Sequence, residues 1–408
     1  MRVLLSTVGT RGDVQPLVTL ASQLEELGGQ VRICAPPDFR DWITGLGIPF
    51  APLGSRLDDE AAGASVAWHE LTADERNRLA EKMVAARFGA ILEAARDCDV
   101  VLGFAPLQVA ARSVAEKLGL PYVYATHCPA TLPSAHHAPP LLPGQSPAPG
   151  PVDNRALWEE DARGWQETFG AALNTQRVAA GLPPVSDVRS HIFTDRPWLA
   201  ADPALGPWPE PGDGTVFQPG AWLPRDERPL SPELTAFLDA GAPPVYFGFG
   251  SMPAPQEFSR VVIEAARSLG HRVVLSHGWA GLSPIDDRPD CLAIGEANLR
   301  ALFGRVAAVV HAGSSGTLTL AALAGAPQVV LPQAWDHFYW AERIDELGIG
   351  SAHAPGAPTV GSLAAALERA LAPAVVARAR AFPVRTDGAA IAAERLSALG
   401  TAARRSHT

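Results

Sequence analysis

Cysteine is scarce in this sequence of 408 residues. The four cysteines, Cys34, Cys98, Cys128 and Cys291, lie far apart, and no two have the CxxC spacing of a zinc or redox site. Neither a disulfide framework nor a structural zinc site is therefore expected. The pattern is typical of buried thiols in a reducing cytosol.

Long apolar segments and an excess of positive charge are also missing. No apolar run of membrane-spanning length is free of Gly, Pro and charge, and the first residues predict a strand rather than a signal peptide. The sequence has 33 Lys and Arg against 43 Asp and Glu, a net charge of −10. This charge argues against nucleic acid or an anionic membrane surface as a partner. We expect a cytoplasmic protein with no stable membrane insertion.

Apolar residues are plentiful: they make up 47% of the chain, and its length favours two domains. Short buried strands alternate with amphipathic helices in both halves, which predicts an α/β fold with parallel sheets. A stretch rich in Pro and Gly at 203–214 ends the first half. We place the domains at 1–207 and 228–384, with a linker at 208–227.

The stretch 306–348 carries the strongest functional pattern. An apolar run at 306–310 predicts a buried strand, residues 311–317 a turn of small residues, and 318–324 a helix. A second strand at 328–331 leads into the loop 332–337 and another helix. Both loops follow strands at the carboxyl edge of the predicted sheet, which is where open parallel sheets bind ligands.

The first of these loops favours a phosphate. Its glycines let the backbone approach a ligand, and the free N–H groups of a helix start attract an anion. Polar side chains add donors: His311, Ser314, Ser315 and Thr317, beside Gly313 and Gly316. An ordinary glycine-containing turn is the alternative. The neighbouring Asp336 and His337 favour a polyhydroxy group attached to the phosphate, hence a nucleotide sugar.

Five stretches carry a family resemblance: 1–13, 194–202, 226–233, 246–251 and 311–317. They span nearly the whole chain, and together they resemble GT-B glycosyltransferases of the bacterial natural-product branch, which glycosylate glycopeptide and polyketide antibiotics. The resemblance implies two Rossmann-like domains facing each other across a cleft, the first for the acceptor and the second for the donor. It also implies that a last helix, in 385–408, returns to the first domain.

The same resemblance implies roles for individual residues. Asp13 matches the proposed general base, although its position alone favours a helix-stabilising carboxylate. Thr10 and Arg11 would approach the donor diphosphate from the opposite domain. The diphosphate would be held by Ser251, His311, Ser314, Ser315, Gly316 and Thr317, the nucleobase by Trp279 and Ile294, and the sugar by Asp336 and His337. A buried core tryptophan is the alternative for Trp279.

Two patterns raise the question of a metal. Asp97 and Asp99 form an Asp-x-Asp pattern, but they precede a strand, away from the ligand edge, and a solvated turn is expected. His127, His136 and His137 lack convergent ligands, so contact with the acceptor or simple exposure is expected. We therefore predict no metal, and no cofactor beyond a nucleotide sugar as co-substrate.

The expected activity is inverting transfer of a sugar from a TDP- or UDP-sugar to a hydroxyl group of a hydrophobic natural-product aglycone. The alternatives are C- or N-glycosyl transfer on the same scaffold, a nucleotide-sugar 2-epimerase, and a catalytically silent accessory protein that binds a nucleotide sugar. The sequence departs from the family pattern at Ser315, which replaces an alanine, and at His337, which replaces a glutamine. The second change leaves the sugar preference open.

Overall fold

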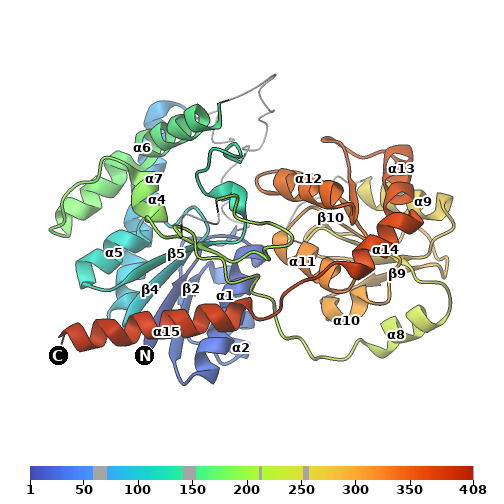
Figure 1. The fold of residues 1–408 in the computed structure, drawn as a ribbon, viewed down its shortest axis with the longest axis horizontal. Coiled ribbons are helices and arrows are strands. Elements are labelled where there is room, and N and C mark those ends of the chain that lie inside the picture. The colour runs from blue at the N-terminus through green and yellow to red at the C-terminus, as the bar shows by residue number, and fades with distance from the viewer. Residues whose placement is uncertain (58–70, 141–152, 211–213, 251–256, 408) are drawn as a thin grey trace.

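A computed structural model describes residues 1–57, 71–140, 153–210, 214–250 and 257–407. Two parallel six-stranded sheets form the centres of two lobes (Figure 1), with strand orders β3-β2-β1-β4-β5-β6 and β12-β11-β10-β7-β8-β9. Counted from its own first strand, each sheet has the order 3-2-1-4-5-6 of a Rossmann fold. The predicted α/β architecture of GT-B type is confirmed.

The strands of the first sheet are short and mostly buried. They are β1 (Arg2–Ser6), β2 (Gln30–Ala35), β3 (Phe50–Pro52), β4 (Val100–Phe104), β5 (Tyr122–Thr126) and β6 (Trp198–Leu199). The helices of this half are α1 (Arg11–Glu26), α2 (Arg40–Gly45), α4 (Ala73–Ala95), α5 (Ala111–Leu118), α6 (Asn154–Ala179) and α7 (Val188–Phe193).

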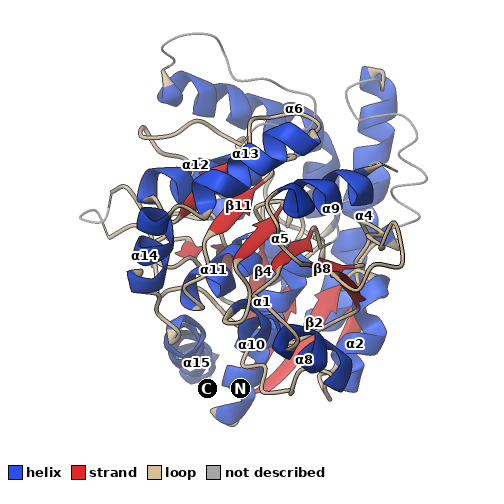
Figure 2. Ribbon diagram, turned by 90° about the vertical axis from the view of Figure 1, so that its right-hand side faces the viewer, coloured by secondary structure: helices blue, strands red, loops and turns tan. Residues whose placement is uncertain are grey.

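The second sheet repeats the alternation of strand and helix. Its strands are β7 (Val245–Gly248), β8 (Val273–Ser276), β9 (Cys291–Ile294), β10 (Ala308–His311), β11 (Gln328–Val330) and β12 (Gly350–Ala352). The helices are α8 (Pro232–Asp239), α9 (Phe258–Ser268), α10 (Leu299–Phe303), α11 (Ser315–Leu323), α12 (His337–Leu347), α13 (Val360–Ala370), α14 (Pro373–Ala381) and α15 (Gly388–His407). In Figure 2 the strands lie inside, with helices such as α9, α12 and α13 around them.

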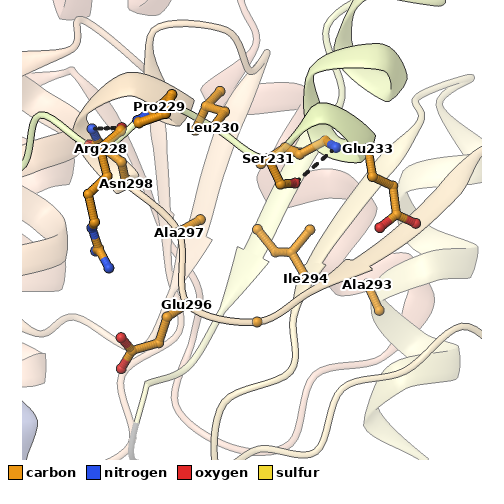
Figure 3. Close-up of a pocket in the computed structure, with 12 residues that line it drawn as sticks. Arg228, Pro229, Leu230, Ser231, Glu233, Ala293, Ile294, Glu296, Ala297 and Asn298 are labelled. Carbon is orange, nitrogen blue, oxygen red and sulfur yellow. Dashed lines mark hydrogen bonds between the residues drawn. The ribbon is translucent and has the colours of Figure 1, made fainter. Parts of the chain in front are cut away.

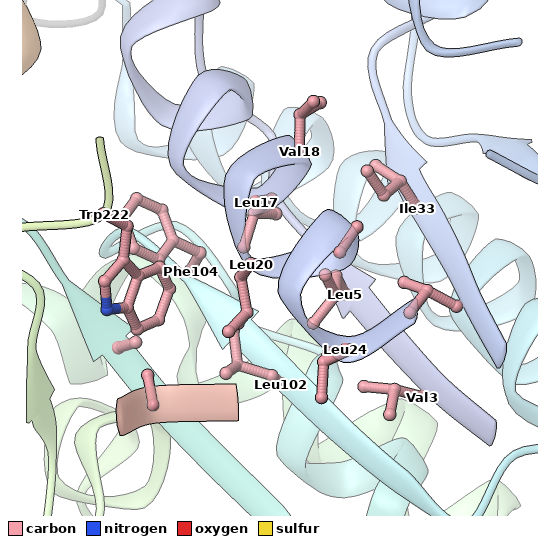
Figure 4. Close-up of a cluster of buried hydrophobic side chains, with 14 of the residues drawn as sticks. Val3, Leu5, Leu17, Val18, Leu20, Leu24, Ile33, Leu102, Phe104 and Trp222 are labelled. Atoms are coloured by element: carbon pink, nitrogen blue, oxygen red, sulfur yellow. The ribbon is translucent and has the colours of Figure 1, made fainter. Parts of the chain in front are cut away.

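The packing of α1 on β1 fixes the position of the first loop (Figure 4). Val3 and Leu5 point to one face of the sheet, where they meet the α1 stripe formed by Leu17, Leu20 and Leu24. This spacing is the apolar face of a helix, and the alternation is that of a strand. Because β1 is buried on both faces, the turn between β1 and α1 is held at the carboxyl edge of the sheet.

Helix α15 lies beside α1, although the two are at opposite ends of the chain (Figure 1). Its residues Ala389, Ala392, Ala393 and Leu396 are buried in the same core as Leu17. Among the described helices, none alone is long and apolar enough to cross a membrane; only the bent pair α13 and α14, taken together, has that length and composition.

Candidate active site

Asp13 lies in the first turn of α1, directly after β1. Its Oδ2 accepts a hydrogen bond from the backbone N–H of Thr10 at 3.0 Å, and its Oδ1 lies 3.2 Å from Nε2 of His127. Gly9 lies against the carboxylate, since a Cβ there would come within 1.8 Å of Oδ2. Asp13 therefore stabilises the helix start, as its position alone indicates, and also contacts a residue outside its own loop.

His127 follows β5 and lies between two carboxylates from different lobes. Its Nδ1 is 3.6 Å from Oδ2 of Asp336, close enough for an ion pair but too long for a hydrogen bond. Burial disfavours the charged imidazole, but the hydrogen bond to Asp13 and the charge of Asp336 outweigh it and raise the pKa of His127 to about 9. His127 is therefore protonated at neutral pH.

The sequence patterns predict contact with the acceptor or simple exposure for His127, not a position between two carboxylates. One signal for a site residue was present, because His127 follows a predicted strand and so lies at the ligand edge of the first sheet. Its contact with Asp336 had no signal in the sequence, since that contact depends on how the two sheets face each other.

The loop before α12 contains the two candidate sugar-binding residues. Oδ2 of Asp336 accepts a hydrogen bond from Nε1 of Trp340 at 3.1 Å. His337 is buried, and burial lowers its pKa, so its imidazole is neutral. Its Nδ1 has no hydrogen-bond partner within the described part of the chain. A buried polar atom without a partner suits contact with a ligand.

The glycine loop leads from β10 into α11. His311 ends the strand; its Nε2 lies 2.9 Å from Gln328 Oε1, and its Nδ1 accepts the backbone N–H of Gly313 at 3.1 Å. Burial lowers the pKa of His311 to about 4, so the ring is neutral; Nδ1 holds the loop and Nε2 holds the neighbouring strand β11. Direct donation from His311 to a phosphate stays a prediction.

The start of α11 has the features of an anion site. Ser314 is the N-cap residue, but its side chain does not cap the helix; its hydroxyl donates to Oγ1 of Thr317 at 3.1 Å. Ser314 therefore leaves the first backbone N–H groups of the helix, at Ser315 and Gly316, uncapped, and these groups have no partner inside the helix itself. Such groups favour a phosphate.

A pocket of about 320 Å³ lies between the segment before α8 and the loop after β9 (Figure 3). Ile294 lines it, together with apolar side chains such as Leu230 and Ala297. Trp279 is absent from its lining and is 48% exposed, which excludes the alternative of a buried core tryptophan. Of the two candidate nucleobase residues, the structure places only Ile294 at a pocket.

Arg11 contacts a residue that lines this pocket. Its guanidinium pairs with Glu296 at 3.0 Å and stacks over the ring of Trp42 at 3.4 Å. Glu296 also lines the pocket, so this ion pair joins the start of α1 to the second lobe. In this structure the cation predicted to approach the diphosphate is held by a carboxylate beside the proposed nucleotide site.

The remaining candidates are placed as follows. Ser251 lies outside the described residues. Asp97 pairs with Arg32 of β2 at 2.8 Å, and Asp99 accepts the backbone N–H of Arg2 of β1, so the two aspartates hold the first two strands. Among the described residues, no group of three or more His, Cys, Asp or Glu side chains could hold a metal ion.

Comparison with known proteins agrees with this fold. A family model described as Erythromycin biosynthesis protein CIII-like, C-terminal domain, matches residues 260–394, and one described as Glycosyltransferase family 28 N-terminal domain matches residues 3–136. The solved structure of the glycosyltransferase VinC in complex with dTDP superposes with a TM-score of 0.68 at 21% identity, over 99% of this chain and 100% of that chain.

Two relatives from Amycolatopsis orientalis are similar along nearly their entire length. Glycosyltransferase GtfE is 52% identical over 402 residues, which cover 98% of this chain and 97% of the relative. Vancomycin aglycone glucosyltransferase is 49% identical over 400 residues, which cover 97% of each chain.

Proposed function

The chain belongs to the GT-B glycosyltransferases of the bacterial natural-product branch, and on this basis we propose that it moves a sugar from a TDP- or UDP-sugar to a hydroxyl group of a hydrophobic aglycone. The relative named for the vancomycin aglycone favours a glycopeptide acceptor. The first lobe, residues 1–207, binds the acceptor, and the second, 228–384, binds the donor.

The observation that carries this proposal is the link that His127 makes between Asp13 and the second lobe. His127 joins Asp13, in the first turn of the first lobe, to Asp336, in the loop that we assign to the sugar. A base on one domain must reach a sugar held by the other for transfer to occur in one step. This arrangement brings the proposed base and the proposed sugar-binding loop to either side of one imidazole.

The proposed reaction is a single displacement. Asp13 accepts the proton of the acceptor hydroxyl as its oxygen bonds to the anomeric carbon of the sugar. The bond from that carbon to the diphosphate breaks on the opposite face, so the configuration inverts. The N–H groups at the start of α11, with the hydroxyls of Ser314, Ser315 and Thr317, stabilise the departing charge in place of a metal.

The remaining donor contacts complete the proposed site. Ile294 and the pocket in Figure 3 hold the nucleobase, and Asp336 and His337 hold the sugar. Thr10, Arg11, Ser251, His311 and Gly316 complete the diphosphate site, and Trp279 flanks the nucleoside. For Arg11 to contact the diphosphate, its guanidinium must leave the ion pair with Glu296.

The test is incubation of purified protein with TDP- and UDP-sugars and a panel of aglycones, in EDTA, with products followed by mass spectrometry. We expect one sugar to be added to a glycopeptide aglycone, and the product to be cleaved by mild acid. An acid-resistant product indicates C-transfer, and donor conversion without acceptor indicates an epimerase. Tight donor binding with no transfer to any aglycone contradicts the proposal and favours a silent accessory protein.

A further inference from the structure

Trp340 is the residue that fixes the carboxylate of Asp336. The indole ring is almost fully buried, with 1% of its surface exposed, and its N–H donates to Oδ2 of Asp336 at 3.1 Å. His127 contacts the same oxygen, Oδ2. Within the described residues nothing hydrogen-bonds to Oδ1, so this oxygen is left for a ligand.

Trp340 is itself in contact with the first lobe. Gly206, which follows β6, lies against the indole ring: a Cβ at that position would come within 2.6 Å of Cη2 and 2.9 Å of Cζ3. One turn further along α12, Nε of Arg343 donates to the carbonyl oxygen of Leu205 at 3.1 Å. The backbone at 205–206 is therefore fitted to one face of α12.

The contacts form a continuous path from one lobe to the other. Gly206 lies against both the Trp340 ring and Pro129, which belongs to the loop that begins with His127. The Asp336 carboxylate is thus held by two side chains. The indole of Trp340 packs on the first lobe, and the imidazole of His127 belongs to the first lobe. A change at Gly206 would move the indole, and with it the hydrogen bond to Oδ2.

We propose that Trp340 is a positioning residue that turns Oδ1 of Asp336 toward the donor sugar, and that its contact with Gly206 makes sugar recognition depend on the packing of the two lobes. This inference rests on the proposed function for the identity of the ligand. It separates two parts of donor binding: the diphosphate and the nucleoside bind to residues away from Trp340, and only binding of the sugar depends on Trp340.

The first variant for the test is Trp340→Phe, which keeps an aromatic ring at this position but removes the indole N–H. The second, Gly206→Ala, displaces the ring from the other lobe without touching the donor site. Trp222→Phe is the matched control, because Trp222 is also buried and its indole N–H has no partner among the described residues. Gly164→Ala is the second control, since a Cβ at Gly164 meets nothing within 4 Å.

The measurement is the affinity of each variant for TDP and for TDP-glucose (or the uridine pair, if wild type prefers it) by calorimetry, together with KM and kcat for transfer. We expect Trp340→Phe and Gly206→Ala to weaken binding of the nucleotide sugar about 10-fold, in line with loss of a hydrogen bond to a charged group, with TDP affinity changed less than about 2-fold. Both controls should match wild type.

Equal loss of TDP and TDP-glucose affinity in Trp340→Phe would mean a general structural role and overturn the inference, as would unchanged binding of both. If Trp340→Phe does not fold, the comparison of TDP and TDP-glucose affinity is made with Gly206→Ala alone, and the same two results would overturn the inference. A wild-type protein that transfers no sugar contradicts the proposed function, whereas the ratio of the two affinities still tests the role of Trp340.

Discussion

The carboxylates of Asp13 and Asp336, which come from different lobes, are bridged by one protonated imidazole. Oδ1 of Asp13 lies 3.2 Å from Nε2 of His127, and Oδ2 of Asp336 lies 3.6 Å from Nδ1. The two carboxylates therefore contact the same cation from either side. Placement of the proposed base and approach of the two lobes depend on the same interaction.

Replacement of Asp13 by asparagine should stop transfer without loss of donor binding. The amide keeps the size of the side chain but cannot accept the acceptor proton, so we expect kcat to fall by about 10²- to 10⁴-fold. Initial rates followed by mass spectrometry and TDP titrations measure the two effects. Asp287→Asn, at an exposed aspartate, is the control and should transfer normally. Wild-type rates for Asp13→Asn would exclude Asp13 as the base.

The contribution of His127 to stability should depend on pH. Its pKa is raised from 6.5 to about 9 in the folded protein, so the folded state binds the proton more tightly than the unfolded state. The stabilisation is fully present below about pH 6.5 and disappears as the pH rises through about 9.

Urea unfolding of wild type and His127→Gln at pH 6, 7.5 and 9 measures this effect. The difference in free energy of unfolding between the two proteins should be largest at pH 6 and smallest at pH 9. A difference that stays constant or grows toward pH 9 would show that His127 is not a buried cation.

Gly313→Ala should destabilise the protein and weaken donor binding. Gly313 has a φ of +111°, and a Cβ there would lie 3.0 Å from Val330 Cγ1 and 3.1 Å from His337 Cα. We expect a loss of about 2 kcal/mol in the free energy of unfolding. Gly361→Ala in α13 is the matched control, because a Cβ there meets nothing within 4 Å. This substitution should raise the free energy of unfolding by up to about 1 kcal/mol. Similar effects of the two substitutions would contradict this account of the loop.

The backbone of Trp335 is strained, since its φ is +55°. A side chain in this left-handed conformation costs roughly 1 kcal/mol, whereas glycine adopts it freely. The ring is 46% exposed, so its removal costs little packing. Thermal unfolding should therefore find Trp335→Gly more stable than Trp335→Ala by about 1 kcal/mol. An alanine variant as stable as the glycine variant would show that the backbone is not strained.

Much of the fold follows from local patterns that the sequence displays. The spacing of Leu17, Leu20 and Leu24 predicts the buried face of α1, and the apolar run at 306–310 predicts most of β10. Ile294, which the family resemblance assigns to the nucleobase, ends β9 and lines a pocket. Trp279, which follows β8, does not line that pocket.

The sequence by itself determined the two α/β halves and the glycine loop, since helix and strand periods and turn residues act over a few positions. The candidate base Asp13 was indicated only by the resemblance to a family. Only the tertiary structure decided that His127 lies between Asp13 and Asp336, that Arg11 pairs with Glu296, and that Gly206 lies against Trp340. The physical reason is that these contacts join residues far apart in the chain. They depend on how two separately formed sheets face each other, and no local pattern specifies that orientation.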